Sequence, residues 1–225
     1  MIDVLIIGAG PMGLMAANLL NESGVKIRVI EKNHDQVHES RALGVQPKSL
    51  ELFHNIGIID SVLKRGMVAS GMQLFIDGER KGEISFQSLG RDDTPYPYVF
   101  FLSQAETEKI LTNELLTKGI HVERDCEAIS MDQYAPHASV TVLKKGIKEE
   151  ISTAYVIGAD GAHSFVRKQL GLKFEGGAYP QHFVLGDVKV DWPLSHDKLT
   201  IFFHKKSFGA FFPLQSNEMG RVLAV

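Results

Sequence analysis

The chain has 225 residues, of which 44% are hydrophobic, and a formal net charge of −3. This length suffices for a buried core and fits one large domain or one and a half domains. The near-neutral balance leaves no basic stripe for nucleic acid, and no apolar run approaches the roughly 20 residues that span a bilayer. The apolar start lacks the basic region and cleavage site of a signal peptide. We therefore expect a soluble, cytoplasmic protein that does not bind nucleic acid and does not span a membrane.

The chain contains one cysteine, Cys126. A single cysteine cannot form an internal disulfide, which favours a reducing compartment. We expect Cys126 to be a buried or half-buried apolar residue.

The first thirty residues predict a βαβ unit. Residues 3–7 form a short apolar run with β-branched side chains, which is typical of a strand buried on both faces of a parallel sheet. Glycines follow this run, and residues 14–21 predict a helix that ends near Gly24. Residues 25–30 predict a second buried strand.

The middle of the chain mixes helices with antiparallel strands. A helical segment begins near Lys48, and a further short helix follows Gly57. Residues 72–86 alternate in polarity and predict β-hairpins. Ser103 opens a capping-box pattern, which predicts the start of a helix, and Gly119 is placed to end that helix.

The remaining segments predict mostly strands. Before residue 175, we expect strands at 121–124, 140–143, 147–151 and 155–157, and a helix at 164–170. Expected after it are strands alone, at 183–190, 199–204, 209–214 and 221–225. The change from mixed helices and strands to strands alone predicts a β-rich second domain that begins near residue 175. The chain stops at Val225 in a predicted strand, so we expect the natural protein to be longer.

The first predicted loop carries the pattern G-x-G-x-x-G, beginning at Gly8. It follows a predicted strand and opens a helix, which is the context that a dinucleotide-binding loop requires. Gly8 permits the tight turn, Gly10 lets the backbone approach a pyrophosphate, and Gly13 lets the helix pack close to the strand. Pro11 and Met12 lie between these glycines at the predicted anion site, where a helix N-terminus offers free N–H groups.

Glu31 ends the second predicted strand, about 20 residues after the glycines, where a carboxylate accepts hydrogen bonds from the ribose 2′-OH of an adenine dinucleotide. The same charge would repel a 2′-phosphate, so NADP is disfavoured at this site. Lys32 follows and is grouped with Glu31 as a cofactor-binding candidate. The plainer alternative for Glu31 is a solvated charge at the end of a strand.

The loop alone does not distinguish FAD from NAD. A helix and antiparallel strands follow Glu31, which resembles the FAD-binding domain of the glutathione-reductase-like flavoproteins. Three segments sharpen this into a resemblance to the aromatic hydroxylases of the p-hydroxybenzoate hydroxylase type. They are Ser40-Arg41-Ala42 before a helix, Gln104 at the start of a helix, and residues 158–167 (GADGAHSFVR), which are similar to the "DG" motif of that family.

The resemblance implies an α/β fold in which a Rossmann-like FAD-binding domain of the glutathione-reductase type precedes a β-rich substrate domain that is incomplete at its C-terminal end. Residues 1–175 would form the first domain, with residues 72–97 contributing to the substrate region. Residues 176–225 would begin the second domain. The family's second FAD motif, a Gly-Asp segment, has no counterpart here, since Gly186-Asp187 comes too early and reads as part of a strand.

The resemblance also assigns roles to three side chains. Arg41 would lie near the FAD pyrophosphate and the flavin edge, Gln104 would hydrogen-bond the ribityl or phosphate region, and Asp160 would help to hold the pyrophosphate. Each has a plainer alternative: a surface ion pair for Arg41, a first-turn helix residue for Gln104 and a helix cap for Asp160. Capping is compatible with cofactor binding because a capped helix start is also an anion site.

The implied reaction uses FAD as cofactor and NAD(P)H as electron donor. Reduced flavin would react with O2 to give a C4a-hydroperoxide, which hydroxylates a small phenolic substrate. The substrate pocket would lie between the FAD-binding domain and the β-rich sheet. Four strand residues there would either line the pocket or fill the sheet's core, namely Phe202, Phe203, Phe211 and Phe212. Neither a catalytic side chain nor a metal site is predicted.

Three other functions stay open. One is a flavoprotein of the same fold with different chemistry, such as an isoprenoid reductase or a halogenase. Another is a truncated fragment that binds a nucleotide and catalyses nothing. A plain NAD-dependent dehydrogenase is disfavoured by the antiparallel strands. The oligomeric state also stays open, a homodimer included.

Overall fold

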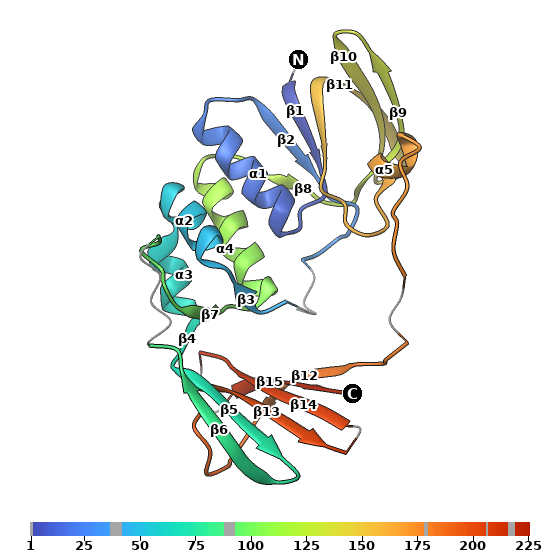
Figure 1. Cartoon of the computed structure of the whole chain (residues 1–225). Helices are drawn as coiled ribbons and strands as arrows, with labels where there is room; N and C mark the ends of the chain where they lie inside the picture. The colour runs from blue at the N-terminus through green and yellow to red at the C-terminus, as the bar shows by residue number, and fades with distance from the viewer. Residues whose placement is uncertain (1, 37–41, 88–92, 178–179, 206, 216–218) are drawn as a thin grey trace. The chain divides into compact units, whose positions relative to one another are not determined.

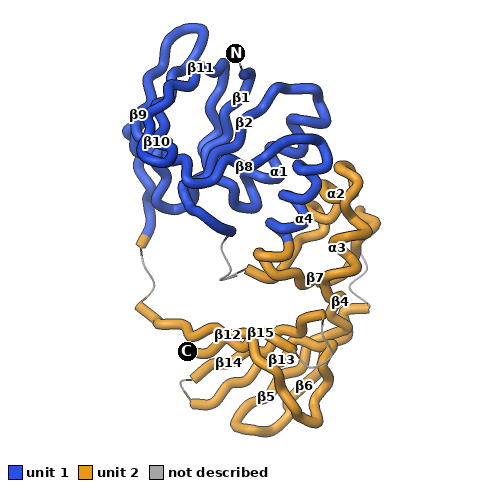
Figure 2. The backbone as a smooth tube through the Cα atoms, turned by 180° about the vertical axis from the view of Figure 1, so that it is seen from behind, with its two compact units in different colours: residues 1–39, 107–176 blue, residues 40–106, 177–225 orange. Residues whose placement is uncertain are grey.

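The computed structural model describes residues 2–36, 42–87, 93–177, 180–205, 207–215 and 219–225. The chain forms two compact units, each assembled from two stretches of sequence. Unit 1 comprises residues 1–39 and 107–176, and unit 2 comprises residues 40–106 and 177–225 (Figure 2). The division into a FAD-binding and a substrate-binding domain stays a prediction.

Unit 1 is built on a six-stranded sheet with the order β8-β2-β1-β11-β10-β9 (Figure 1). Its strands are β1 (Ile2–Ile7), β2 (Ile27–Ile30), β8 (Val122–Glu123), β9 (Cys126–Tyr134), β10 (His137–Lys144) and β11 (Ile147–Gly158). From β8 to β11 neighbouring strands are parallel, whereas β11, β10 and β9 are antiparallel. Helix α1 (Pro11–Glu22) connects β1 to β2 and completes the predicted βαβ unit.

Strand β11 corrects one prediction. Two separate strands were expected at 147–151 and 155–157, but the structure has one continuous strand, whose first half pairs with β10 and whose second half pairs with β1. The polar residues between the two apolar runs continue the ladder. Thr153 is fully buried, and its hydroxyl donates to the carbonyl of Asp3. The sequence also predicts that the strand at 155–157 is buried, but its first residue, Tyr155, is exposed.

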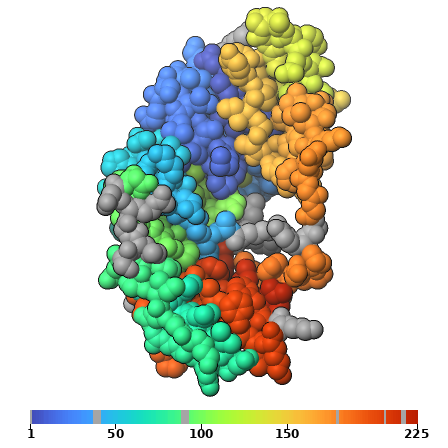
Figure 3. Space-filling view, in the orientation of Figure 1, coloured from blue at the N-terminus to red at the C-terminus, as the bar shows by residue number. Residues whose placement is uncertain are grey.

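Strand β9 was not predicted. It pairs with β10 and contributes Cys126 and Ala128 to a core cluster of unit 1, together with Leu5, Ile30 and Val142. Its remaining residues are largely exposed, so its sequence lacks the regular alternation that marks a half-buried strand. Figure 3 shows β9 and β10 (yellow-green) beside β11 (gold) on the surface. The prediction that Cys126 is buried is confirmed, and burial raises the pKa of its thiol.

Helix α4 (Gln104–Thr117) begins and ends as its sequence predicts. The Ser103 hydroxyl accepts a hydrogen bond from the Glu106 amide at 3.2 Å, and Gly119 ends the helix with a φ of +74°. The middle of α4 contacts α1, where the side-chain amide of the buried Asn18 donates a hydrogen bond to the Leu111 carbonyl at 3.1 Å. The short helix α5 (Phe165–Gln169) follows β11.

The described residues of unit 2 form two sheets, two complete helices and the first turn of α4. The helices are α2 (Pro47–Asn55) and α3 (Ile59–Arg65). The smaller sheet has the order β3-β7-β4, with strands β3 (Gly44–Val45), β7 (Val99–Phe101) and β4 (Met67–Ala69). The larger has the order β12-β15-β14-β13-β5-β6, with strands β5 (Gly71–Ile76), β6 (Glu79–Ser85), β12 (Val184–Lys189), β13 (Lys198–His204), β14 (Ser207–Pro213) and β15 (Met219–Ala224). Its strands are antiparallel except for the parallel pair β13 and β5.

All four phenylalanines that were expected to line a pocket or fill a core contact other rings within unit 2, although Phe203, which lies 5.3 Å from Phe208, is exposed. Phe211 is buried, and its ring contacts the Trp192 ring edge to face at 4.6 Å. Phe212 packs on Phe101 at 5.7 Å, and Phe202 stacks on Phe75 at 5.3 Å.

The described helices include none that is both long and apolar enough to cross a membrane.

Candidate cofactor-binding site

Three loops of unit 1 meet at one edge of its sheet. They follow the carboxyl ends of β1, β2 and β11, which are adjacent and parallel. The first carries the glycines Gly8, Gly10 and Gly13, the second carries Glu31, and the third carries Asp160. Ligands of open α/β sheets bind in the crevice outside the carboxyl ends of such strands. The structure therefore brings together three parts of the site predicted from distant segments of the sequence.

Gly8 and Gly13 are required by close backbone contacts. Gly8 has a φ of +106°, a conformation that residues with side chains rarely adopt. A Cβ on Gly8 would lie less than 3.0 Å from the carbonyl oxygen of Ala159, and a Cβ on Gly13 would lie less than 3.0 Å from that of Gly8. The amide of Ala159 also donates to the Ile7 carbonyl at 2.8 Å. These contacts hold the first and third loops against each other.

Gly10 differs from these two glycines. A Cβ added to Gly10 would meet no protein atom within 4 Å, so the space beside it is open. Gly10 is the N-cap of α1, Pro11 occupies the first turn, and that turn has neither a side-chain cap nor an acidic residue. The N–H groups and the positive end of the helix dipole are thus presented to an anion at this loop.

Glu31 is fixed beside the same loop. One carboxylate oxygen accepts a hydrogen bond from the Ala9 amide at 2.9 Å, and the other accepts one from the Asn33 amide at 3.0 Å. The carboxylate therefore lies next to the glycines and is only partly buried. Lys32 follows with an exposed side chain. Three residues beyond Glu31, the exposed His34 pairs with Asp125 at 2.8 Å, and this hydrogen bond raises the pKa of His34.

The Asp160 carboxylate holds the start of α5. It accepts hydrogen bonds from the Ser164 hydroxyl at 2.6 Å and from the amides of Phe165 and Val166 at 2.6 and 3.3 Å. Ser164 is the N-cap, since its hydroxyl accepts from the Arg167 amide at 3.0 Å. The capping function foreseen for Asp160 is thus shared with Ser164, which was predicted as the first helical residue. The preference of serine for N-cap positions was the signal that would have identified it.

Replacing Asp160 and Ser164 separately distinguishes capping from cofactor binding. Either Asp160→Ala or Ser164→Ala is expected to lower the free energy of unfolding by about 1–2 kcal/mol, because each removes a cap of α5. If Asp160 also supports FAD binding, only Asp160→Ala weakens it, by about tenfold or more. Denaturant unfolding and FAD titration of both variants measure the two effects. If Asp160→Ala and Ser164→Ala lose FAD affinity equally, Asp160 acts only as a helix cap.

Two further residues were predicted to bind the cofactor. Arg41 lies outside the described residues. Gln104 is the first residue of α4, as predicted, and it belongs to unit 2. The cofactor roles of both residues stay predictions.

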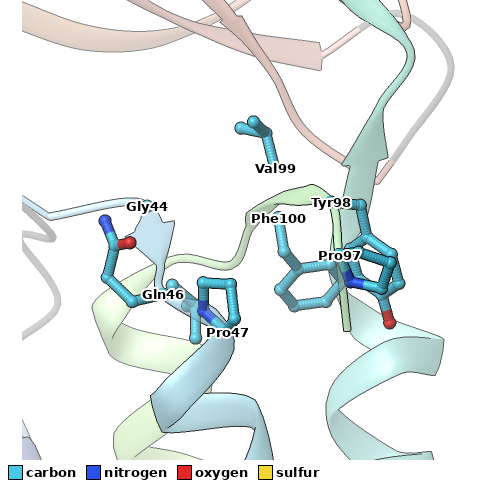
Figure 4. Close-up of a pocket in the computed structure, with 8 residues that line it drawn as sticks. Gly44, Gln46, Pro47, Pro97, Tyr98, Val99 and Phe100 are labelled. Carbon is cyan, nitrogen blue, oxygen red and sulfur yellow. The ribbon is translucent and has the colours of Figure 1, made fainter. Parts of the chain in front are cut away.

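Unit 2 has a pocket of about 200 Å³, lined by residues 44–47 and 97–100. Figure 4 shows the Gln46 side chain on one side of it and the Tyr98 ring, with Pro97, on the other. Burial raises the pKa of the Tyr98 hydroxyl, with a further contribution from Tyr96. A cavity of about 150 Å³ holds benzene in another protein, so this pocket has room for a single aromatic ring. No prediction from sequence identified it.

The residues at the sheet edge of unit 1 fit an adenine dinucleotide. The open space at Gly10 leaves room for a pyrophosphate, the uncapped start of α1 supplies donors to it, and Glu31 supplies an acceptor for a ribose hydroxyl. None of these features separates FAD from NAD.

The comparison with known proteins makes this distinction. Residues 1–225 match the family described as "FAD binding domain". The chain therefore belongs to this family of FAD-binding domains.

Curated relatives of the chain are named as monooxygenases and hydroxylases. The chain is 34% identical over 196 residues to a 6-methylpretetramide 4-monooxygenase from Streptomyces rimosus, a match covering 87% of this chain and 35% of the relative. It is 31% identical over 199 residues to a 3-(3-hydroxy-phenyl)propionate/3-hydroxycinnamic acid hydroxylase from Burkholderia vietnamiensis, covering 84% and 31%. The chain thus spans about a third of the length of these relatives.

A solved structure with the same fold is the p-nitrophenol 4-monooxygenase PnpA from Pseudomonas putida DLL-E4. It matches 99% of this chain and 57% of its own length with a TM-score of 0.89 and 23% identity. The ternary complex of aklavinone-11 hydroxylase with FAD and aklavinone matches 99% of this chain and 45% of its own length, with a TM-score of 0.84 and 23% identity. These likenesses establish the fold, and they confirm the predicted α/β architecture with its FAD-binding domain.

Proposed function

We propose that this chain is the FAD-binding part of an FAD-dependent, NAD(P)H-consuming monooxygenase that hydroxylates a phenolic or other aromatic substrate. The observation that carries the proposal is the junction of the Gly8 loop, Glu31 and the Asp160 loop at one sheet edge, in a chain of the FAD-binding family. The relatives' names support the monooxygenase class.

Bound FAD would supply the redox chemistry, by the C4a-hydroperoxide route that the resemblance implies. In the balanced reaction, substrate, NAD(P)H, a proton and O2 give hydroxylated substrate, NAD(P)+ and water. The chain's own residues bind and orient. The amides at the start of α1 would hold the pyrophosphate, and the carboxylate of Glu31 would accept from the adenosine ribose. Asp160 would keep the third loop in place through its bonds to the start of α5.

The substrate class is the finer part of the proposal. A hydroxyphenyl acid and a nitrophenol are named as substrates of similar proteins. The pocket at Gln46 and Tyr98 has room for a ring of this size. A cytoplasmic location belongs to the same proposal.

The test is a set of turnover measurements on the natural full-length protein with a panel of phenols. We expect NAD(P)H oxidation to accelerate when the right phenol is added, O2 to be consumed with it, and a hydroxylated product to appear. Reduction of a substrate double bond without O2 would instead identify a reductase of the same fold. Flavin binding without turnover of any ring compound would contradict the hydroxylase assignment.

A further inference from the structure

Of the five buried side-chain polar atoms of unit 2 that have no hydrogen-bond partner among the described residues, four belong to one face of the larger sheet and the segment that covers it. They are Gln73 Oε1, Trp192 Nε1, His196 Nδ1 and Thr200 Oγ1. Folded proteins pair nearly all of their buried polar groups, with protein or with ordered water. Four such atoms within one sheet layer therefore call for a common explanation.

The strand register places two of these residues side by side. Gln73 on β5 is paired with Thr200 on β13, and Thr200 is paired with Phe211 on β14. Residues paired across neighbouring strands project from the same face of a sheet. Gln73 and Thr200 are 6% and 0% exposed, so this row of side chains is covered.

The cover is the segment that connects β12 to β13. The Trp192 ring packs edge to face on Phe211 at 4.6 Å, and the His196 ring lies 6.4 Å from Phe211. The Trp192 and His196 rings are 6.2 Å apart. Thr200, Trp192 and His196 therefore lie beside Phe211 on one face of the larger sheet, and Gln73 lies next to Thr200 in the same row.

The orientation of the Gln73 amide is fixed by its other end. Its nitrogen donates to the carboxylate of Glu83 at 3.3 Å. An ionised carboxylate can accept hydrogen bonds but cannot donate them. Exchanging the amide nitrogen and oxygen of Gln73 would therefore place the amide oxygen against the Glu83 carboxylate, so that two acceptors face each other. The buried oxygen of Gln73 is thus an acceptor in need of a donor. The Trp192 indole N–H is a donor in need of an acceptor, and the Thr200 hydroxyl is both.

We propose that these groups form an internal hydration site that holds at least one ordered water molecule. Water matches the set because it can accept from Trp192 and donate to Gln73, while Thr200 or His196 supplies a further partner. Buried waters typically make about three hydrogen bonds to otherwise unsatisfied groups. The site lies within unit 2 and does not depend on the proposed function.

Two measurements on the 225-residue chain test the site, and they use the fact that Trp192 is its only tryptophan. The single indole N–H resonance of Trp192 is expected to show a direct cross-peak to a long-lived water. Water ¹⁷O relaxation dispersion, which exchanging hydroxyl protons do not affect, counts such waters. We expect Thr200→Val to lower the dispersion amplitude by about one water's contribution.

The control is Thr141→Val, which makes the same change on β10 of unit 1 and is expected to leave the amplitude and the indole cross-peak unchanged. An indole N–H that is protected from exchange but shows no water cross-peak would overturn the proposal, and would point to a direct bond from Trp192 to Gln73. An amplitude that Thr200→Val leaves at the wild-type level would overturn it as well. The presence or absence of the indole–water cross-peak is measured on the wild-type chain alone, so this part of the test does not depend on whether the variant folds.

Discussion

Replacing Gly13 by alanine is expected to lower the free energy of unfolding by about 1–3 kcal/mol and to abolish measurable FAD binding. The new Cβ would lie less than 3.0 Å from the backbone oxygen of Gly8 and against Ala159. Backbone atoms cannot rotate away as a side chain can, so the start of α1 has to move. That movement separates the helix amides from the loop that they complete.

Gly10→Ala is the matched variant, because its Cβ meets no protein atom and its backbone already has a φ of −74°. Loss of the preferred N-cap glycine is expected to cost about 0.5–1 kcal/mol. The added methyl would occupy the space through which the pyrophosphate approaches, so FAD affinity should fall by about tenfold or more. Urea unfolding and FAD titration of both variants give the comparison. Wild-type FAD affinity in Gly10→Ala would show that the pyrophosphate does not lie at this loop.

Removing Arg28 is expected to destabilise unit 1 by about 1.5–3 kcal/mol at neutral pH. The Arg28 guanidinium on β2 forms a bidentate ion pair with Glu123 on β8 and also bonds Glu149 on β11, at 2.6 and 3.0 Å. Lys144 on β10 contacts Glu123 at 2.5 Å. Arg28→Met keeps most of the side chain's length and removes the charge that joins these strands.

The same network gives the stability a defined pH dependence. The hydrogen bond from Arg28 lowers the pKa of Glu123, and Lys144 adds to this effect. A carboxyl group with a lowered pKa stabilises the fold above its unfolded value of about 4.3, and this stability is lost as pH falls through the folded pKa. The deficit of Arg28→Met should therefore be full at pH 7 and shrink below pH of about 4.3.

Urea unfolding at a series of pH values measures this deficit. Glu127→Gln is the control, because Glu127 is an exposed carboxylate on β9, and we expect it to behave as the wild type does. A deficit of Arg28→Met that stays constant down to pH 3 would mean that lost packing, rather than the ion pairs, accounts for the destabilisation.

The sequence identified the parts of the fold that depend on local signals. The βαβ unit, the hairpin of β5 and β6 and the start and end of α4 follow from glycines, caps and periodicity over a few residues. Strand β9 was not predicted, because most of its side chains are exposed and its sequence shows no regular alternation of apolar and polar residues. The continuity of β11 was not predicted either. The buried Thr153 hydroxyl donates a hydrogen bond to the carbonyl of Asp3, a residue distant in the sequence, and no local pattern reveals this contact.

The candidate site was predicted in its residues but not in its contacts. The glycines and Glu31 follow a spacing that the dinucleotide chemistry dictates. The contact of Gly8 with Ala159 joins segments about 150 residues apart, and only the pairing of β1 with β11 brings them together. Likewise, a capping function was foreseen for Asp160 beside its cofactor role, but its hydrogen bonds to Ser164 and Phe165 were not predicted.

The Gly8 loop and Glu31 are proposed to hold FAD. The most direct test is the visible absorption spectrum of the natural full-length protein as purified, followed by FAD titration of its Gly10→Ala variant. We predict a yellow protein whose flavin bands persist through gel filtration, and a weaker affinity in the variant. A protein that is colourless as purified, and stays colourless after mixing with FAD and gel filtration, would show that these residues do not hold FAD.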